Sequence, residues 1–435
     1  MKENAKAKGW TIVTMLAGFS LMSYVLRMNI SVASKFMMPE FGLSQIQMGQ
    51  VFSSFMLGYA LFQMPAGMLG DRWGPRLVLA LAGLSWAITT CLTALIPGVL
   101  ITSATGVFVC LLLIRFCLGA GEAATYPVAT RSIANWIPPS DRALTNAIVI
   151  AGATAGAAAT PPLISWLMIH HGWRSSFYIT GAASLLLSLV WWIKGADSPK
   201  AASWIPTLGQ ATSPASQEAA KSAKKASWKA VLGKRDLWIL SIGYMFDSYV
   251  LFIFVFWLYT YLTDVRGFSL LRGGFFTSLP FVVASVMTPI GGYVCDRLCV
   301  RLGARRGRRI QPVASLILSG ACLFIGAEVA DPYIAIAVLA LSVGFIESTE
   351  GAYWSTANDI AAEHVGAAGG LMNMFGNFGG VFSTALVPVL VKHFGWLVAL
   401  GSGTVAAGFA AVLWFWVHVE RGAIAHPSAA VVQFE

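Results

Sequence analysis

Charged side chains stand inside several long apolar segments of this sequence. Arg27 lies in the first segment, Arg115 and Glu122 lie in another, and Glu347 and Glu350 lie in a third. If these segments cross a membrane, each charge costs at least about 2.5 kcal/mol at the bilayer centre and is a functional candidate. A buried arginine offers a planar fork of N–H donors that suits a carboxylate, and a buried glutamate can carry a proton.

Arg27 belongs to a polar stripe along its own segment. The side chains that fall within about 60° of it, at 100° per residue, are Ser20, Ser23, Tyr24, Ser31 and Ser34. The stripe predicts that Arg27 faces a central cavity and binds an anion there. The alternative is that Arg27 extends to the membrane surface, or pairs with an acid to hold helices together.

Arg115 and Glu122 share one helix face with Tyr126, and the two charges are two helical turns apart. A direct bond between the charges would be strained at this separation. Desolvation favours the neutral form of Glu122, whereas a nearby cation favours its carboxylate. This competition predicts that Glu122 carries a proton and that Arg115 is its charge partner. The alternative is a static ion pair with another helix.

Glu347 and Glu350 share one side of a helix because they are three positions apart. Two close carboxylates resist simultaneous ionisation, which predicts a second proton site. The alternative is a structural pairing with Arg115 or Arg27. Glu347 also follows Glu122 by 225 residues, which suggests that both face a shared axis.

Neutral polar residues extend the predicted binding surface, namely Tyr59, Gln63, Asn373 and Asn377. The two asparagines are one helical turn apart in a glycine-rich stretch, where the alternative is a hydrogen bond across closely packed helices. Asp247 is expected near a helix end, as a gate or a solvated residue.

Membrane-spanning helices must position these side chains. Of the 435 residues, 57% are hydrophobic and 11% are charged, whereas a soluble domain has about 25% charged residues. A helix needs about 20 apolar residues to cross the bilayer. Twelve such segments run over residues 10–34, 46–70, 77–97, 101–124, 143–168, 174–194, 237–262, 272–295, 311–329, 332–356, 366–391 and 395–418. These continuous runs exclude a β-barrel, so the predicted fold is an all-α membrane protein with twelve transmembrane helices.

A repeat divides the twelve segments into six and six. The run Gly67-Met-Leu-Gly-Asp71-Arg72-Trp-Gly74-Pro-Arg76 ends one segment, and Gly291-Gly-Tyr-Val-Cys-Asp296-Arg297 ends another. Further pairs at spacings of 223 to 225 are Ser44 with Ser269, Gly49 with Gly274, Pro65 with Pro289 and Gly172 with Gly395. Duplications of this kind build transporters around a site between two pseudo-symmetric bundles.

The repeat also predicts domains and orientation. We expect an N-terminal six-helix bundle at 1–194, a cytoplasmic linker at 195–235, and a C-terminal bundle with a short cytoplasmic tail at 236–435. With the N-terminus in the cytoplasm, 22 of the 29 Lys and Arg residues fall on that side, as the positive-inside rule requires.

The net charge of +10 therefore reflects topology, and the Lys-rich linker is expected near anionic lipid rather than on a nucleic acid.

The ends of the repeated runs predict a cytoplasmic gate. Ion pairs and helix-end contacts there would involve Asp71, Arg72, Arg76, Asp296 and Arg297. The alternative is that their arginines only fix the topology. The sequence has no CxxC, HExxH or other Cys/His cluster of metal-binding spacing, so we expect no metal, cofactor, disulfide or catalytic residue.

At the loop from Gly67 to Arg76 the chain is similar to the signature of the major facilitator superfamily. Over most of its length it resembles the anion:cation symporter family, which includes bacterial galactonate, glucarate and hexuronate transporters and sialin. The resemblance is carried by Tyr24-Val-Leu-Arg27-Met-Asn29, Tyr59-Ala-Leu-Phe-Gln63-Met-Pro65, Arg115 to Pro127, and Asn373-Met-Phe-Gly-Asn377.

The resemblance implies a major facilitator fold, and import of an organic anion with protons across the inner (plasma) membrane by alternating access. The expected substrate is a sugar acid such as an aldonate, an aldarate or a hexuronate. By analogy, Arg27 with Tyr24 and Tyr59 holds the substrate carboxylate, and Asn373 or Asn377 meets its hydroxyls.

One position departs from that family. Bacterial sugar-acid members often have Asp immediately before the arginine of the first helix, where this chain has Leu26. With Glu122 as the proton carrier, this leaves the number of protons open, and Glu350 is the candidate replacement. The alternatives for function are an exporter or antiporter of a metabolite or drug, and a membrane sensor derived from a transporter. We expect a monomer that is not an enzyme.

Overall fold

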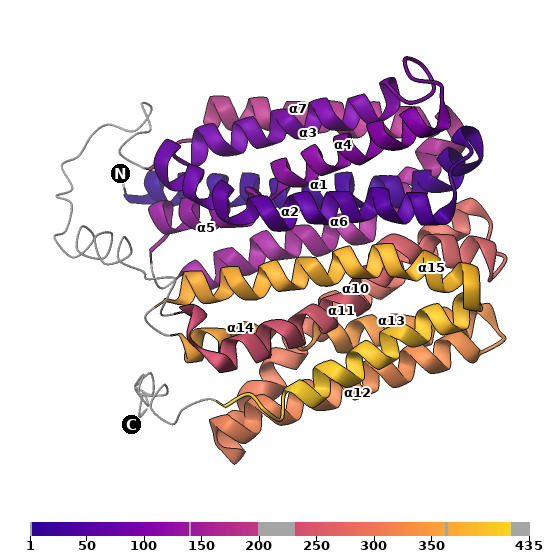
Figure 1. The fold of residues 1–435 in the computed structure, drawn as a ribbon. Helices are drawn as coiled ribbons and strands as arrows, with labels where there is room; N and C mark the ends of the chain where they lie inside the picture. The colour runs from indigo at the N-terminus through magenta and orange to yellow at the C-terminus, as the bar shows by residue number, and fades with distance from the viewer. Residues whose placement is uncertain (1, 139–140, 199–230, 362–363, 419–435) are drawn as a thin grey trace, which may run out of the picture.

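The computed structural model describes residues 2–138, 141–198, 231–361 and 364–418, and within these ranges the elements are helices. Figure 1 shows the helices side by side in two groups. The first group contains α1 (Lys2–Phe41), α2 (Gln45–Trp73), α3 (Pro75–Leu95), α4 (Ala104–Glu122), α5 (Thr125–Trp136), α6 (Arg142–His171) and α7 (Trp173–Lys194). The second contains α10 (Arg235–Asp264), α11 (Leu270–Leu302), α12 (Ala304–Glu328), α13 (Pro332–Glu347), α14 (Glu350–Ile360) and α15 (Val365–Leu413). Most of the predicted linker lies outside the described residues.

The helices account for twelve membrane crossings, as the sequence predicted. Ten apolar stretches of the described chain are long enough to span a membrane. One of them, Gly366–Leu413, has 48 residues, about twice the length of one span. It is broken at Gly395, where φ is 82° and ψ is 174°. α2 is not among the ten, but it packs along α4 and α15; α2 and both parts of α15 complete the twelve.

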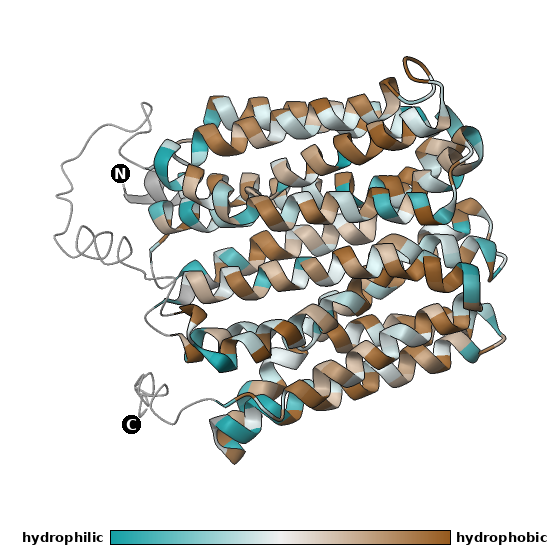
Figure 2. Cartoon of the chain, in the orientation of Figure 1, coloured by the Kyte–Doolittle hydropathy of each residue, from teal (hydrophilic) through white to brown (hydrophobic). Residues whose placement is uncertain are grey.

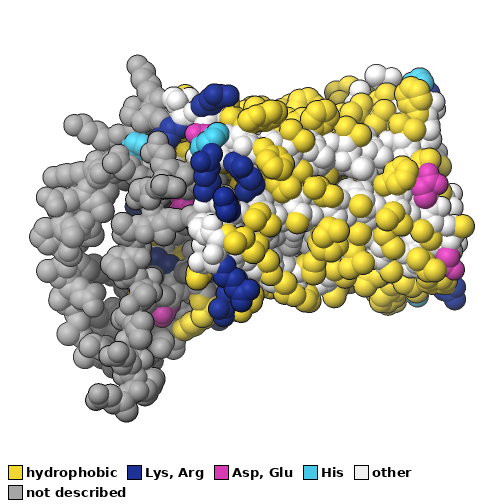
Figure 3. Space-filling model, turned by 90° about the horizontal axis from the view of Figure 1, so that it is seen from below, with side chains coloured by type: hydrophobic (Ala, Val, Ile, Leu, Met, Phe, Trp, Pro, Cys, Tyr) yellow, Lys and Arg dark blue, Asp and Glu magenta, His cyan; other side chains and the backbone are white. Residues whose placement is uncertain are grey.

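The outer surface fits a lipid environment. Large apolar side chains such as Leu113, Leu186 and Ile193 are more than half exposed. Figure 2 shows hydrophobic residues along the length of the helices. Figure 3 shows apolar side chains over the flank of the molecule, with Lys and Arg side chains gathered mainly toward one end. A soluble monomer rarely exposes such an area of apolar surface. This is the surface of a multi-pass membrane protein.

The sequence repeat is visible in the backbone. Gly42 and Gly267 have φ values of 65° and 71°, which glycine adopts at little cost. Two residues later, Ser44 and Ser269 are the N-caps of α2 and α11, and each accepts a hydrogen bond from a backbone N–H of the first turn. The matched Gly-x-Ser motifs therefore start equivalent helices in the two halves.

The fourth and tenth crossings are interrupted at equivalent points. α4 ends at Glu122 and α5 begins at Thr125, while α13 ends at Glu347 and α14 begins at Glu350, so two residues lie between the half-helices in each case. At the first break, the Thr125 hydroxyl donates to the Glu122 carbonyl over 2.7 Å. Side-chain bonds of this kind compete with the helical ladder. Each break leaves a glutamate at the end of a half-helix, and broken helices of this kind line binding sites in transporters.

Candidate functional site

Arg27 lies in the middle of α1 and is only 3% exposed. Its guanidinium carbon lies 4.8 Å from the ring centres of Tyr24 and Tyr59 and 5.2 Å from that of Phe55. Aromatic rings at such distances stabilise a cation that has lost its water. The structure therefore places Arg27 inside the protein, between aromatic side chains of α1 and α2, and not at the lipid surface.

Glu122 is the acidic partner of Arg27. The distance between Arg27 Nη2 and Glu122 Oε2 is 3.4 Å, and the Glu122 side chain is fully buried. A strong charge-assisted bond is shorter, at about 2.7–2.9 Å. Arg27 Nε and Glu122 Oε1 are buried and have no hydrogen-bond partner among the described residues. The pair therefore has unused hydrogen-bonding capacity, which a ligand or a proton can satisfy.

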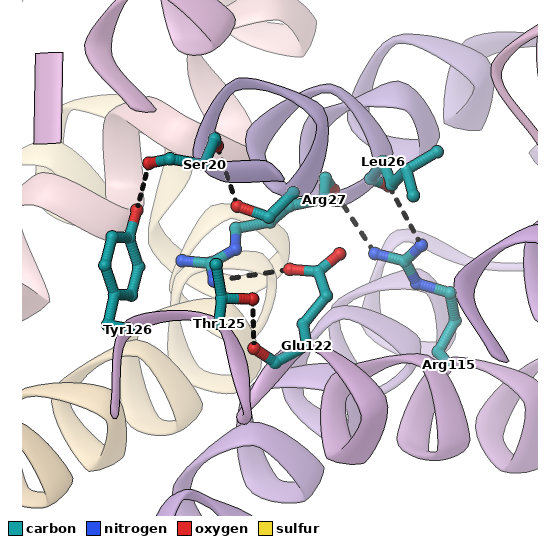
Figure 4. A network of polar contacts seen from close by, with 8 residues as sticks. Ser20, Leu26, Arg27, Arg115, Glu122, Thr125 and Tyr126 are labelled. Carbon is teal, nitrogen blue, oxygen red and sulfur yellow. Dashed lines mark hydrogen bonds and ion pairs between the residues drawn. The ribbon is translucent and has the colours of Figure 1, made fainter. Parts of the chain in front are cut away.

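Arg115 supports the site without pairing with Glu122. Its guanidinium donates to the backbone carbonyls of Leu26, over 3.3 Å, and Arg27, over 3.2 Å, and it lies 4.8 Å from the Phe55 ring centre. The separation of Arg115 and Glu122 by two helical turns is consistent with the absence of a direct bond between them. Figure 4 shows Arg115 reaching the α1 backbone while Glu122 points toward Arg27. Arg115 therefore fixes the segment of α1 that presents Arg27.

Tyr126 adds a neutral contact to the polar stripe of α1. Its hydroxyl and that of Ser20 are 3.0 Å apart (Figure 4). The Ser23 hydroxyl donates to the Ser20 carbonyl over 2.8 Å. Because α4 stops at Glu122, Tyr126 belongs to α5. Because of the break, the crossing formed by α4 and α5 contacts α1 at two points, through the Glu122 carboxylate and through the Tyr126 hydroxyl.

The two glutamates of the C-terminal half do not pair with either arginine in the described part of the chain. Glu350 accepts hydrogen bonds from the Tyr244 hydroxyl and the Trp354 indole, both over 2.8 Å. Glu347 is half-buried, and its charge acts on Tyr24 of α1. Glu347 therefore faces the boundary between the two halves.

Comparisons with known proteins identify the family. Residues 15–384 match the model of the Major Facilitator Superfamily. The chain belongs to this superfamily. Its family and its relatives are membrane transporters and not enzymes, and the predicted major facilitator fold is confirmed.

Bacterial relatives of this transporter are similar to it over most of their length. The chain is 33% identical over 402 residues to a probable sulfoacetate transporter, SauU, of Cupriavidus necator, covering 91% of this chain and 90% of that one. It is 28% identical over 384 residues to a hexuronate transporter of Bacillus subtilis, covering 87% of each. A solved structure of a bacterial homologue of the human lysosomal transporter Spinster matches with a TM-score of 0.73 at 19% identity, over 94% of this chain and 97% of that one.

The neutral polar residues of the transporter differ in their surroundings. Gln63 is 8% exposed, and its buried Oε1 lacks a hydrogen-bond partner among the residues described. Asn377 Nδ2 donates to the Asn373 carbonyl of its own helix over 2.8 Å. Gln63 thus has an open acceptor, whereas the Asn377 amide is bonded within its own helix.

Asp247 corrects one expectation. It is 3% exposed and accepts a hydrogen bond from the Thr349 hydroxyl over 2.8 Å, so it is neither solvated nor at a helix end. The reason is that α10 begins at Arg235, which places Asp247 more than three turns inside the helix.

The predicted gate residues contact neighbours in their own half. Asp71 pairs with Arg131 over 2.9 Å, and both side chains are about half exposed or more. Arg76 donates to the Trp192 carbonyl over 2.7 Å, and Arg297 donates to the Tyr293 hydroxyl over 3.0 Å. Arg72 and Asp296 are exposed.

Contacts between the halves lie toward the opposite end of the molecule, away from the termini. Lys35, in the last two turns of α1, pairs with Asp264 at the end of α10. The Ser53 hydroxyl on α2 donates to the Val381 carbonyl on α15 over 2.9 Å. The sequence did not predict this ion pair, because Lys35 is recognisable from sequence only as a charge on the outer side. It also did not predict that Phe55 contacts the two arginines, because an apolar residue in an apolar segment does not stand out.

The described residues include no group of three or more His, Cys, Asp or Glu side chains in a metal-binding arrangement.

Proposed function

We propose that this transporter imports an organic anion together with protons, by alternating access, across the inner (plasma) membrane with both termini in the cytoplasm. The observation that carries the proposal is the buried Arg27–Glu122 pair, which is long and incompletely hydrogen-bonded. Relatives named for sulfoacetate and hexuronate transport support an anionic substrate. The basic residues at the end that carries the termini support the orientation.

Competition for Arg27 couples the anion to the proton. An ionised Glu122 occupies the guanidinium, whereas a protonated Glu122 leaves it free to bind the substrate carboxylate in a bidentate fork. The site is then closer to neutral, which lowers the cost of enclosing it in a dry cavity. A tenfold proton gradient supplies about 1.4 kcal/mol for each proton carried inward.

The substrate we propose is a sugar acid, either an aldonate, an aldarate or a hexuronate. The half-buried Asn373 and the open Gln63 acceptor are available for its hydroxyls. The second candidate is a short sulfonated carboxylate, favoured by the 33% identity to the sulfoacetate transporter. Both candidates carry the carboxylate that Arg27 requires.

Reconstituted protein in liposomes tests the proposal. We expect galacturonate, galactonate, glucarate or sulfoacetate to accumulate when the outside is acidified, and we expect Arg27→Ala to abolish this uptake. Arg301→Ala, which changes an exposed arginine, is the matched control and should transport normally. Melting temperatures show whether each variant is folded. Accumulation that is the same with and without the pH step contradicts the proposal, as does normal uptake by a folded Arg27→Ala protein. Outward movement of cationic drugs would support the exporter instead.

A further inference from the structure

The two halves of the transporter carry unlike charges inside the membrane. The N-terminal half has Arg27 and Arg115 against Glu122, whereas the C-terminal half has Asp247 on α10, Glu347 at the end of α13 and Glu350 at the start of α14. Among the described residues, the charges that act electrostatically on each of these acids come from the other acids of the group, and no Lys, Arg or His contributes. The C-terminal half therefore collects negative charge without a cation to balance it.

The other charged side chains on the surrounding helices are engaged elsewhere or lie near helix ends. On α12, Arg308 pairs with Asp359 near the end of α14, over 2.8 Å. On α11, Arg297 bonds the exposed Tyr293. On α15, Lys392 lies near the end of the crossing that Gly395 terminates. On α1, the electrostatic partners of Arg27 are Glu122 and tyrosines, and not Glu347.

The groups that do contact the acids are neutral donors. Tyr244 and Trp354 donate to Glu350, and Thr349 donates to Asp247. Neutral hydrogen bonds offset only part of the cost of a buried charge, and close carboxylates repel one another. Three ionised acids cannot be held here together without a bound cation.

A buried hydroxyl beside the acids has open hydrogen-bonding capacity. Tyr353 is fully buried, packs against Tyr244 with ring centres 5.1 Å apart, and interacts electrostatically with Asp247 and Glu350. Its hydroxyl makes no hydrogen bond of ordinary geometry with the described residues. A hydroxyl can both donate and accept, so it can serve a carboxylate and its protonated form alike.

We propose that Asp247, Glu347 and Glu350 form a second proton site, shared among the three carboxylates, which takes up at least one proton besides that on Glu122 in each transport cycle. The coupling to transport rests on the function proposed above. Because Glu347 faces Tyr24 and Tyr24 packs on Arg27, an ionised Glu347 repels an anion at Arg27. Proton uptake by the acids therefore accompanies anion binding.

Infrared spectroscopy of the full-length protein in liposomes tests the site with protons alone. A carboxylic acid has a C=O stretching band that its carboxylate lacks, so the band is followed while the pH is raised through neutrality. We expect the wild type to retain a carboxylic acid band near neutral pH that weakens in Asp247→Asn, Glu347→Gln and Glu350→Gln. Glu328→Gln, which changes an exposed acid, should leave the band unchanged.

The outcomes separate this site from the function proposed above, because the titration needs no substrate. A band that is the same in the wild type and all three folded variants overturns the second site, even if anion uptake and the role of Arg27 hold. Loss of the band on adding Na⁺ at constant pH also overturns it, since the acids would then hold a metal cation. In uptake measurements, the number of protons moved per anion should be lower in Glu350→Gln than in the wild type.

Discussion

At the residue scale, the Arg27–Glu122 pair decides how anion and proton compete. We expect Glu122→Gln to remove the part of pH-driven accumulation that the proton on Glu122 supplies, while exchange of labelled for unlabelled substrate continues. Protonation removes the charge that occupies Arg27, so wild-type affinity for the anion should rise as pH falls and weaken as pH rises, by roughly tenfold or more, which corresponds to about 1.4 kcal/mol. The affinity of Glu122→Gln should depend less on pH than that of the wild type, because only the C-terminal acids still titrate. A pH profile in the variant like that of the wild type would refute the assignment.

Arg115 acts on the backbone of α1 and not on the substrate. Hydrogen bonds from a charged donor contribute about 1.5–3 kcal/mol, so Arg115→Met should lower the melting temperature and slow transport. Arg115→Lys should recover part of the stability, because the charge is kept but the fork that reaches both the Leu26 and Arg27 carbonyls is lost. Normal stability in Arg115→Met would show that these bonds contribute little.

At the element scale, a single glycine separates the last two crossings. Gly395 has φ 82° and ψ 174°, a region that other residues enter only at a cost on the order of 1–3 kcal/mol. Gly395→Ala should therefore lower the melting temperature. Gly401→Ala is the matched control, because an added Cβ meets nothing within 4 Å at either position but Gly401 is helical. The control should be neutral or stabilising by roughly 0.4–1 kcal/mol. Equal effects of the two changes would rule out the backbone explanation.

At the scale of the whole molecule, close packing at the end away from the termini holds the halves together. A Cβ on Gly49 would lie 2.4 Å from the Thr384 carbonyl oxygen, and one on Gly274 would lie 2.5 Å from Ser165 Oγ. These repeat partners belong to opposite halves and each faces the other half. Contacts this close cannot accept a methyl group without separation of the helices.

We therefore expect Gly49→Ala to favour the conformation that is open at this end. Spin labels at Gln45 and Arg272, on α2 and α11, should show a longer distance in Gly49→Ala than in the unsubstituted labelled protein. Gly292→Ala on α11, where an added Cβ meets nothing within 4 Å, should leave the distance unchanged. An unaltered distance in Gly49→Ala would mean that these contacts do not control closure.

The sequence by itself determined the membrane environment, the twelve crossings and the duplication. Hydrophobic length, basic loops and recurring Gly-x-Ser and Asp-Arg motifs are local signals, since each reports the solvent or turn that its own segment requires. The cost of an intramembrane charge likewise picked out Arg27, Arg115, Glu122, Glu347 and Glu350 without any knowledge of their neighbours.

Only the tertiary structure decided which of these groups meet. It paired Glu122 with Arg27, directed Arg115 to the α1 backbone, and buried Asp247 beside the C-terminal acids. Spacing along one helix gives the face that a side chain occupies, but not the helix that packs against that face. Partners 95 residues apart, such as Arg27 and Glu122, are therefore set by helix packing and by the break that ends α4, which one-dimensional periodicity does not contain.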